Sequence, residues 1–280
     1  MTKKFSKLIT LGFLFSTITT SVFAVDTSTS NTTPYQAIFN KVSTNVAGKD
    51  GEIVLDEDII KTLTSEEQIL LPEVIEDLSF LYQEGNIFID EESNLQTRSI
   101  EEIAEFTKSE LEANYITEDG ILPIYDPDKP STFSLQSYVN SNTRYLQDYY
   151  DEYVDLMIKY PSLLIMPQLQ TEVEFASKVA EGQPWDYKRY IGWNNLRTVK
   201  IDGKEYYITG EDIGNIHYGY VGRDLGFSTS TLCKAGGLVQ VITSRGGSLK
   251  QFSYDSYYDD PTDQAAIKRG TSWFDNGSFK

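Results

Sequence analysis

The chain has 280 residues, 40% of them hydrophobic, and a formal net charge of −18 at pH 7. It has enough apolar material for a core, and its negative charge argues against bulk attraction to nucleic acid or anionic lipid, because like charges repel. A single cysteine excludes a disulfide within the chain, and a single histidine excludes an all-imidazole zinc site. Any Ser-His-Asp or Cys-His site would have to use His217.

Residues 1–24 have the pattern of a secretory signal peptide. Three lysines precede an apolar stretch from Leu8 to Phe23, and small residues lead up to a cleavage position after Ala24. The alternative is an uncleaved anchor helix, although the stretch is short for a stable span. We therefore expect a secreted, extracellular protein with no stable membrane insertion after cleavage, and a polar tether over residues 25–33.

Charge is distributed unevenly along the rest of the chain. Residues 25–160 contain 8 Lys+Arg and 28 Asp+Glu, a net charge of −20, whereas residues 161–280 contain 13 and 14, a net charge of −1. This change predicts an acidic region over residues 34–160 and a separate module over residues 161–280. We interpret the acid excess as a solvated surface, with a docking face for a basic partner as the alternative.

Apolar residues at three- and four-residue spacings predict helices in the acidic region. One helix begins at Ser65, a second covers residues 97–114, and a third, rich in tyrosine, covers residues 135–160. We expect the aromatic face of the third helix to pack on its neighbours; a sugar- or peptide-binding surface is the alternative.

Beyond Pro161 the pattern changes. Residues 198–209 alternate apolar and polar side chains around Asp202-Gly203, which predicts one short β-hairpin. Three helices should follow, over residues 211–226, over residues 228–242, and from Pro261 onward with Asp260 as N-cap. The expected fold class is therefore mainly α (α+β), with a helical acidic N-terminal region and a helical C-terminal module that contains the hairpin.

The helix expected over residues 211–226 contains Gly219 and Gly222, although each glycine costs about 1 kcal/mol relative to alanine inside a helix. On a helical projection the two glycines share a face, and His217 and Tyr220 lie nearly opposite. We predict that the glycine face lets another backbone approach closely, and that His217 lies in a solvent-reachable hollow on the other side. The alternative is a core helix in which His217 is merely a satisfied polar group.

Three strings resemble the bacterial toxin 44 family of polymorphic toxins. They are PWDYKRYIG (184–192), NIHYGYVGRDLGFS (215–228) and DDPTDQAAIKRG (259–270). The resemblance covers roughly residues 165–275 and leaves out the acidic region. It implies a secreted or delivered effector module behind a variable N-terminal region, with nuclease action as the usual expectation and an immunity protein as a partner.

The resemblance and the residue types together give the site candidates. The catalytic candidates are His217, Tyr220, Arg223, Asp260 and Asp263, and the substrate-binding candidates are Trp185, Asp186, Lys188, Tyr218 and Gln264. We expect neither a metal nor a cofactor. Helix capping is the alternative for the two late aspartates, and a surface salt bridge is the alternative for residues 185–188.

We hypothesise that the module is a toxin-like hydrolase, most concretely a ribonuclease. His217 would act as general base or acid, Arg223 or Lys188 would stabilise the phosphoryl transition state, and Tyr220 would position the substrate. The near-neutral charge of the module argues against this hypothesis, because nucleases usually concentrate positive charge.

Two alternatives remain open. One is a cell-wall-directed enzyme that acts on peptidoglycan with an acid and base pair chosen from Glu172, Glu211, Asp224 and Asp260. The other is a noncatalytic secreted interaction protein.

Overall fold

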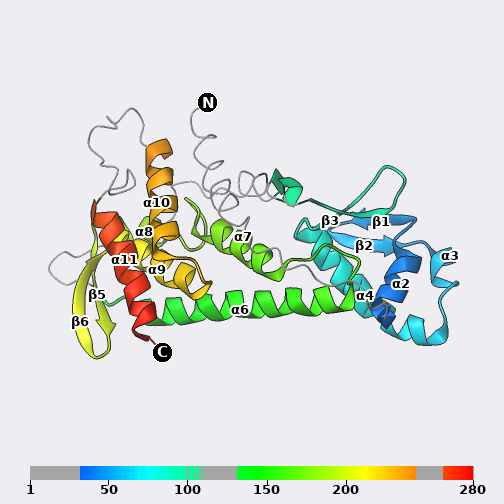
Figure 1. The fold of residues 1–280 in the computed structure, drawn as a ribbon, viewed down its shortest axis with the longest axis horizontal. Helices are drawn as coiled ribbons and strands as arrows, with labels where there is room; N and C mark the ends of the chain where they lie inside the picture. Colours follow the sequence, from blue (N-terminus) through cyan, green and yellow to red (C-terminus); the bar gives the residue numbers. More distant parts are fainter. Residues whose placement is uncertain are drawn as a thin grey trace. The chain divides into compact units, whose positions relative to one another are not determined.

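The computed structural model describes residues 32–99, 101–103, 105–106, 109, 131–243 and 261–279. The predicted signal peptide, nearly all of the tether and the candidate residue Asp260 lie outside these residues. The chain divides into two compact units (Figure 1). Among the described residues, the N-terminal unit comprises those up to 109 together with 149–170, and the C-terminal unit comprises 131–148 together with those from 171 onward. The sequence boundary at residues 160 and 161 stays a prediction.

The N-terminal unit combines helices with short strands. Its elements are α2 (Pro34–Val42), β1 (Val46–Lys49), β2 (Glu52–Leu55), α3 (Glu57–Ile60), α4 (Ser65–Gln83), β3 (Ile87–Ile89), β4 (Leu95–Thr97) and the second part of α6 (Leu135–Lys159). Helix α4 confirms the helix predicted from Ser65, and it begins with a capping box in which Thr64 and Glu67 satisfy each other's backbone N–H groups. The helix expected over residues 97–114 is confirmed in part, because residues 101–103, 105–106 and 109 are helical; Thr97 belongs to β4, and residues 110–114 lie outside the described residues.

Two antiparallel hairpins in this unit were not predicted. β1 pairs with β2, and β3 pairs with β4. Asp50 and Gly51 form the first turn with φ angles of 53° and 86°, values that the Asp-Gly pair adopts readily. In the second turn, the Asp90 side chain accepts a hydrogen bond from the Asn94 N–H at 2.8 Å. The helical description of the acidic region was therefore incomplete, because strands of three or four residues are too short to give a clear alternation.

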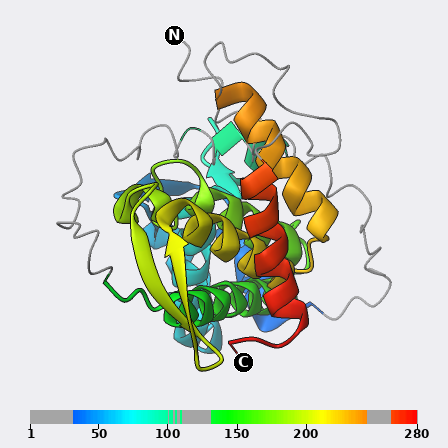
Figure 2. The ribbon, with the colours of Figure 1, turned by 90° about the vertical axis from the view of Figure 1, so that its left-hand side faces the viewer.

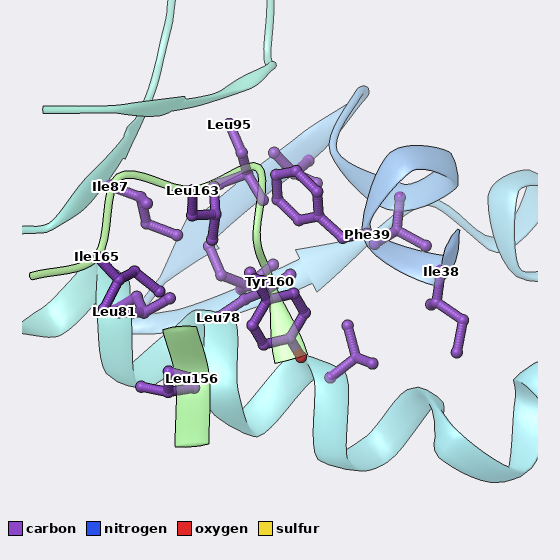
Figure 3. Close-up of a cluster of buried hydrophobic side chains, with 14 of the residues drawn as sticks. Ile38, Phe39, Leu78, Leu81, Ile87, Leu95, Leu156, Tyr160, Leu163 and Ile165 are labelled. Carbon is purple, nitrogen blue, oxygen red and sulfur yellow. The ribbon is translucent and has the colours of Figure 1, made fainter. Parts of the chain in front are cut away.

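The core of the N-terminal unit gathers α2, α4 and the second part of α6, as Figure 3 shows for part of it. Tyr153 and Tyr160 are both fully buried. The Tyr153 hydroxyl accepts a hydrogen bond from Asn86 at 2.7 Å, and the Tyr160 hydroxyl donates one to Asp77 at 2.9 Å. This part of the aromatic face packs on its neighbours, which confirms that interpretation.

The C-terminal unit is mainly helical. Its elements are the first part of α6, the second part of α7 (Pro167–Val179), α8 (Tyr187–Ile191), β5 (Leu196–Ile201), β6 (Lys204–Thr209), α9 (Gly210–Asp224), α10 (Thr229–Thr243) and α11 (Pro261–Asp275). The predicted hairpin is confirmed as β5 and β6, with Asp202 and Gly203 in the turn at φ angles of 50° and 77°. The fold class of mainly α (α+β) is confirmed, and α7 and α8 add to the predicted helices.

The ends of the predicted helices follow local side-chain chemistry. Thr209 caps α9 by accepting a hydrogen bond from the Asp212 N–H at 3.2 Å. Helix α9 ends at Asp224, two residues before the predicted Gly226, which adopts a φ of 93° outside the helix. Ser228 caps α10 by accepting from the Thr231 N–H at 3.0 Å, as predicted.

Helices α9 and α11 make the most extensive contact in the C-terminal unit, and they lie side by side in Figures 1 and 2. A Cβ atom added to Gly219 would overlap the carbonyl oxygen of Ile267, and one added to Gly270 would overlap that of Ile216. Each helix thus supplies a glycine where the other's backbone approaches. The predicted close approach at the glycine face of α9 is confirmed.

The two helices run in the same direction. Asn215 near the start of α9 bonds Asp263 near the start of α11, and Arg223 near the end of α9 pairs with Asp275 at the end of α11. The ends of the helix pair are therefore fixed by polar contacts and its middle by the two glycines.

We expect Gly219→Ala to lower the free energy of unfolding by about 1–3 kcal/mol, because the new methyl group forces the α11 backbone away. Gly214→Ala in the same helix is the matched control. Its Cβ would lie 3.5 Å from the Lys188 backbone nitrogen, an ordinary van der Waals contact, so it should be neutral or stabilise by up to about 1 kcal/mol. Urea unfolding followed by circular dichroism measures both values, and equal effects of the two substitutions would contradict the prediction.

Candidate functional site

His217 lies in the interior of the C-terminal unit. Its side chain is 0% exposed, and its ring packs edge to face against Tyr187 and Trp185, with centroid distances of 4.7 and 5.7 Å. The expectation of a solvent-reachable hollow is therefore wrong. The side of α9 opposite the glycines is covered by α6 and α8, because this helix has buried residues all round.

A buried polar network joins His217 to α6 and α8. The Asn142 side-chain nitrogen lies 2.8 Å from His217 Nε2 and donates a second hydrogen bond to the Tyr187 hydroxyl, also at 2.8 Å. The other ring nitrogen, Nδ1, is buried and has no hydrogen-bond partner. The network therefore connects three helices through one amide and leaves one nitrogen of the imidazole unused.

Sequence reasoning missed Asn142 and Tyr187. A signal for Asn142 was present, because it falls in line with the apolar residues Leu135, Val139 and Leu146 at spacings of four, three and four. A polar side chain inside an apolar helical stripe indicates a buried partner.

Burial controls the protonation of the network. It lowers the pKa of His217 from its ordinary value of 6.5 to about 3, and it raises the pKa of Tyr187 to about 12. Both side chains are therefore neutral at pH 7. An imidazole with so low a pKa is a weak base, since general catalysis works best when the pKa lies near the operating pH.

The string that contains Trp185 makes its own ionic contacts. Asp186 is 5% exposed, accepts a hydrogen bond from the Gly182 N–H at 2.9 Å and lies 3.6 Å from the Arg189 guanidinium. Burial raises the pKa of the Asp186 carboxyl, against the opposing effect of these neighbours. The Lys188 ammonium lies over the Trp193 ring, 4.7 Å from its centroid, so the ion pair within this string joins Asp186 to Arg189.

The remaining candidates hold neighbouring elements together. The Asp263 carboxylate accepts a hydrogen bond from Asn215 at 2.8 Å, and the Gln264 amide donates to the Cys233 carbonyl at 2.8 Å. The Tyr218 hydroxyl donates to the Leu232 carbonyl at 3.3 Å, and its ring stacks on Phe175.

Tyr220 and Arg223 contact the C-terminal end of the chain. The Tyr220 hydroxyl donates to the Ser278 carbonyl at 2.9 Å, and the Arg223 guanidinium bonds Asp275 at 2.9 Å and the Phe227 carbonyl at 3.3 Å. Tyr220 thus binds the chain just after α11, and Arg223 joins the ends of α9 and α11.

The structure brings some predicted residues together and separates others. Trp185 contacts His217 on the side of α9 that faces α6 and α8. Asp263 binds Asn215, which lies two residues before His217 and therefore on nearly the opposite side of the helix. His217 and Asp263 consequently belong to different surroundings, with α9 between them.

Within the described residues, no group of three or more His, Cys, Asp or Glu side chains has an arrangement that could hold a metal ion. Nor does any described helix combine the length and apolar character that a membrane crossing requires.

The sequence of the C-terminal part is similar to a known family. Residues 174–276 match the family model of bacterial toxin 44. This confirms the resemblance found in the three strings, and the match runs from α7 to the residue after α11. No curated protein and no solved structure is significantly similar to the chain. The C-terminal part thus carries a toxin-family domain, whereas Asn142 lies outside the match.

The low pKa of His217 predicts an acid-sensitive fold. The unfolded chain binds a proton below pH 6.5, whereas the folded chain does so only near pH 3, so stability is complete above pH 6.5 and falls as the pH decreases towards 3. Comparing pH 7 with pH 5, we expect the wild type to lose about 2 kcal/mol more unfolding free energy than His217→Gln. Urea unfolding at both pH values measures this difference, and parallel losses in the two proteins would contradict it.

Proposed function

We propose that the chain is an exported bacterial toxin whose C-terminal unit is the effector and cleaves RNA. Its export rests on the signal-peptide pattern of residues 1–24. Its toxicity rests on the bacterial toxin 44 match over residues 174–276. Nucleic acid as the target is the usual expectation for such toxins, and the polar network in the C-terminal unit supplies groups suited to this chemistry.

The network of Asn142, Tyr187 and His217 is the observation that carries the proposal. Polar side chains inside a hydrophobic core lower stability unless they are hydrogen-bonded. An apolar core would pack these helices together without the free-energy cost of a buried polar group that lacks a partner. A departure of this kind from simple packing is typical of functional sites. Two residues of the network, Tyr187 and His217, lie on α8 and α9, which carry two of the three toxin-like strings.

Exposed groups lie near the buried ring. Trp185 contacts both His217 and Tyr145, and Tyr145 is 39% exposed. The Tyr145 hydroxyl donates to Glu174 at 2.5 Å, and Glu174 also pairs with Lys178 at 2.9 Å. A carboxylate, an ammonium and a phenol are therefore grouped beside Trp185.

These groups match the needs of RNA cleavage through the 2′-hydroxyl. The 2′-oxygen bonds to phosphorus as its proton passes to a base, and the phosphorus–O5′ bond breaks as the departing 5′-oxygen takes a proton from solvent water. In this proposal Glu174 accepts the first proton and Lys178 stabilises the charge on the phosphate oxygens. The neutral His217, which is fully buried, contributes a hydrogen bond when a neighbouring side chain moves aside. The aromatic rings of Trp185 and Tyr145 provide surfaces on which bases stack.

The full chain should cleave RNA in preference to DNA and peptidoglycan, and His217→Gln should lower the rate by about 100-fold or more. Tyr207→Phe is the control, because Tyr207 lies on β6 and is 66% exposed. Gel electrophoresis of RNA and DNA, and turbidity of peptidoglycan, measure the three activities, and thermal unfolding verifies that each variant is folded. Cleavage of peptidoglycan alone would replace the proposal with a cell-wall enzyme, and inactivity on all three polymers would overturn it in favour of an interaction protein.

A further inference from the structure

The position of the proton on His217 follows from its neighbour. An amide nitrogen carries two hydrogens and accepts none, so the Asn142 nitrogen donates to both of its partners, the Tyr187 hydroxyl and His217 Nε2. Nε2 must then be the unprotonated nitrogen. Because a neutral imidazole carries one N–H, that hydrogen lies on Nδ1.

The geometry points to Asn142 as the positioning residue that sets the tautomer of His217 and makes the imidazole a neutral hydrogen-bond donor through Nδ1. The tautomer stands on the hydrogen bonds alone. The identity of the acceptor that Nδ1–H binds during a reaction rests on the proposed function.

The Nδ1 nitrogen has the properties of a hydrogen-bond donor that is available to a ligand. It is buried in a side chain that is 0% exposed, and it has no hydrogen-bond partner. Leaving a buried donor unpaired costs about 1–3 kcal/mol, and an anionic acceptor would remove that cost when it binds. A phosphate oxygen of RNA is such an acceptor, and because the ring is fully buried against Trp185 and Tyr187, the phosphate reaches Nδ1 only when a neighbouring side chain moves aside.

The ring's neighbours keep it neutral. Asn142 from α6, Tyr187 from α8 and Trp185 before α8 contact it, and none of them carries a charge at pH 7. Burial is the cause that lowers the pKa of His217, with no ion pair to oppose it. The imidazole therefore stays a neutral donor throughout the physiological pH range.

Asn142 also extends the effector beyond the family match. It lies on the first part of α6, whose Leu135 and Val139 belong to the same hydrophobic core as Tyr187 and Tyr220. Asn140 on the same helix donates to the Phe279 carbonyl at 3.1 Å, which holds the end of the chain. The functional unit therefore includes residues 135–148, which lie before the matched residues 174–276.

A single histidine makes the tautomer directly measurable. In the full chain labelled with ¹⁵N-histidine, nitrogen NMR gives one pair of ring signals, and an unprotonated nitrogen resonates well downfield of a protonated one. We expect Nδ1 protonated and Nε2 unprotonated, with no titration between pH 5 and pH 8. A proton on Nε2, or a titration near the ordinary pKa of 6.5, would overturn the inference.

Asn142→Asp provides the second measurement. A carboxylate accepts and does not donate, so it should draw the proton to Nε2 and raise the pKa of His217 by about 1–3 units. Asn140→Asp is the matched control, because it makes the same change two residues earlier on α6, at a residue that bonds Phe279. It should leave the tautomer unchanged. An unaltered tautomer in folded Asn142→Asp would overturn the inference, and Tyr187→Phe, which keeps the ring and removes only the hydroxyl, should preserve Nδ1–H if Asn142→Asp does not fold.

Activity separates this inference from the proposed function. If the chain cleaves RNA, Asn142→Asp should lower the rate by about 100-fold or more while Asn140→Asp retains it. If the chain cleaves no RNA, the proposed function fails, and the ¹⁵N spectra still decide the role of Asn142. Full RNA cleavage by Asn142→Asp with a changed tautomer would overturn the donor role of His217.

Discussion

The C-terminal unit depends on the close approach of α9 and α11. Gly219 and Gly270 remove the side chains that would hold the two backbones apart, and Asn215 with Asp263 and Arg223 with Asp275 fix the two ends of the pair. Glycine inside a helix lowers its intrinsic stability, so tertiary packing must offset that loss. The geometry of α9, and with it the orientation of everything that α9 carries, follows from this contact.

Since α11 takes one face of α9, helices α6 and α8 cover the opposite face. This arrangement encloses His217, and enclosure determines its chemistry. In water an imidazole exchanges a proton near neutral pH, whereas in this interior it stays neutral and its tautomer is chosen by an amide. A fixed hydrogen-bond network thus distinguishes the surroundings of His217. Asp186 and Arg223 form their ion pairs elsewhere, with Arg189 and Asp275.

Local signals predicted much of the fold, and long-range contacts explain what they left out. The Asp202-Gly203 hairpin, the Ser228 cap and the glycine face of α9 depend on neighbours in sequence, and all three were found. The burial of His217 depends on α6, about 75 residues away, and no local pattern records it. The helical projection gave two faces of α9 correctly but could not show that both are covered. The Asp50-Gly51 pair is a turn signal, but the strands on either side of it are too short to show a clear alternation of apolar and polar residues.

Helix α6 has a consequence for any exchange of the matched domain between proteins. The family match begins at residue 174, yet the first part of α6 closes the core of the C-terminal unit and supplies Asn142. A genetic exchange that transferred only the matched segment would give a domain with an open core, in which His217 lacks its amide neighbour. Productive recombination must therefore break the gene upstream of α6, so the stretch just before the recognisable domain should be inherited together with it.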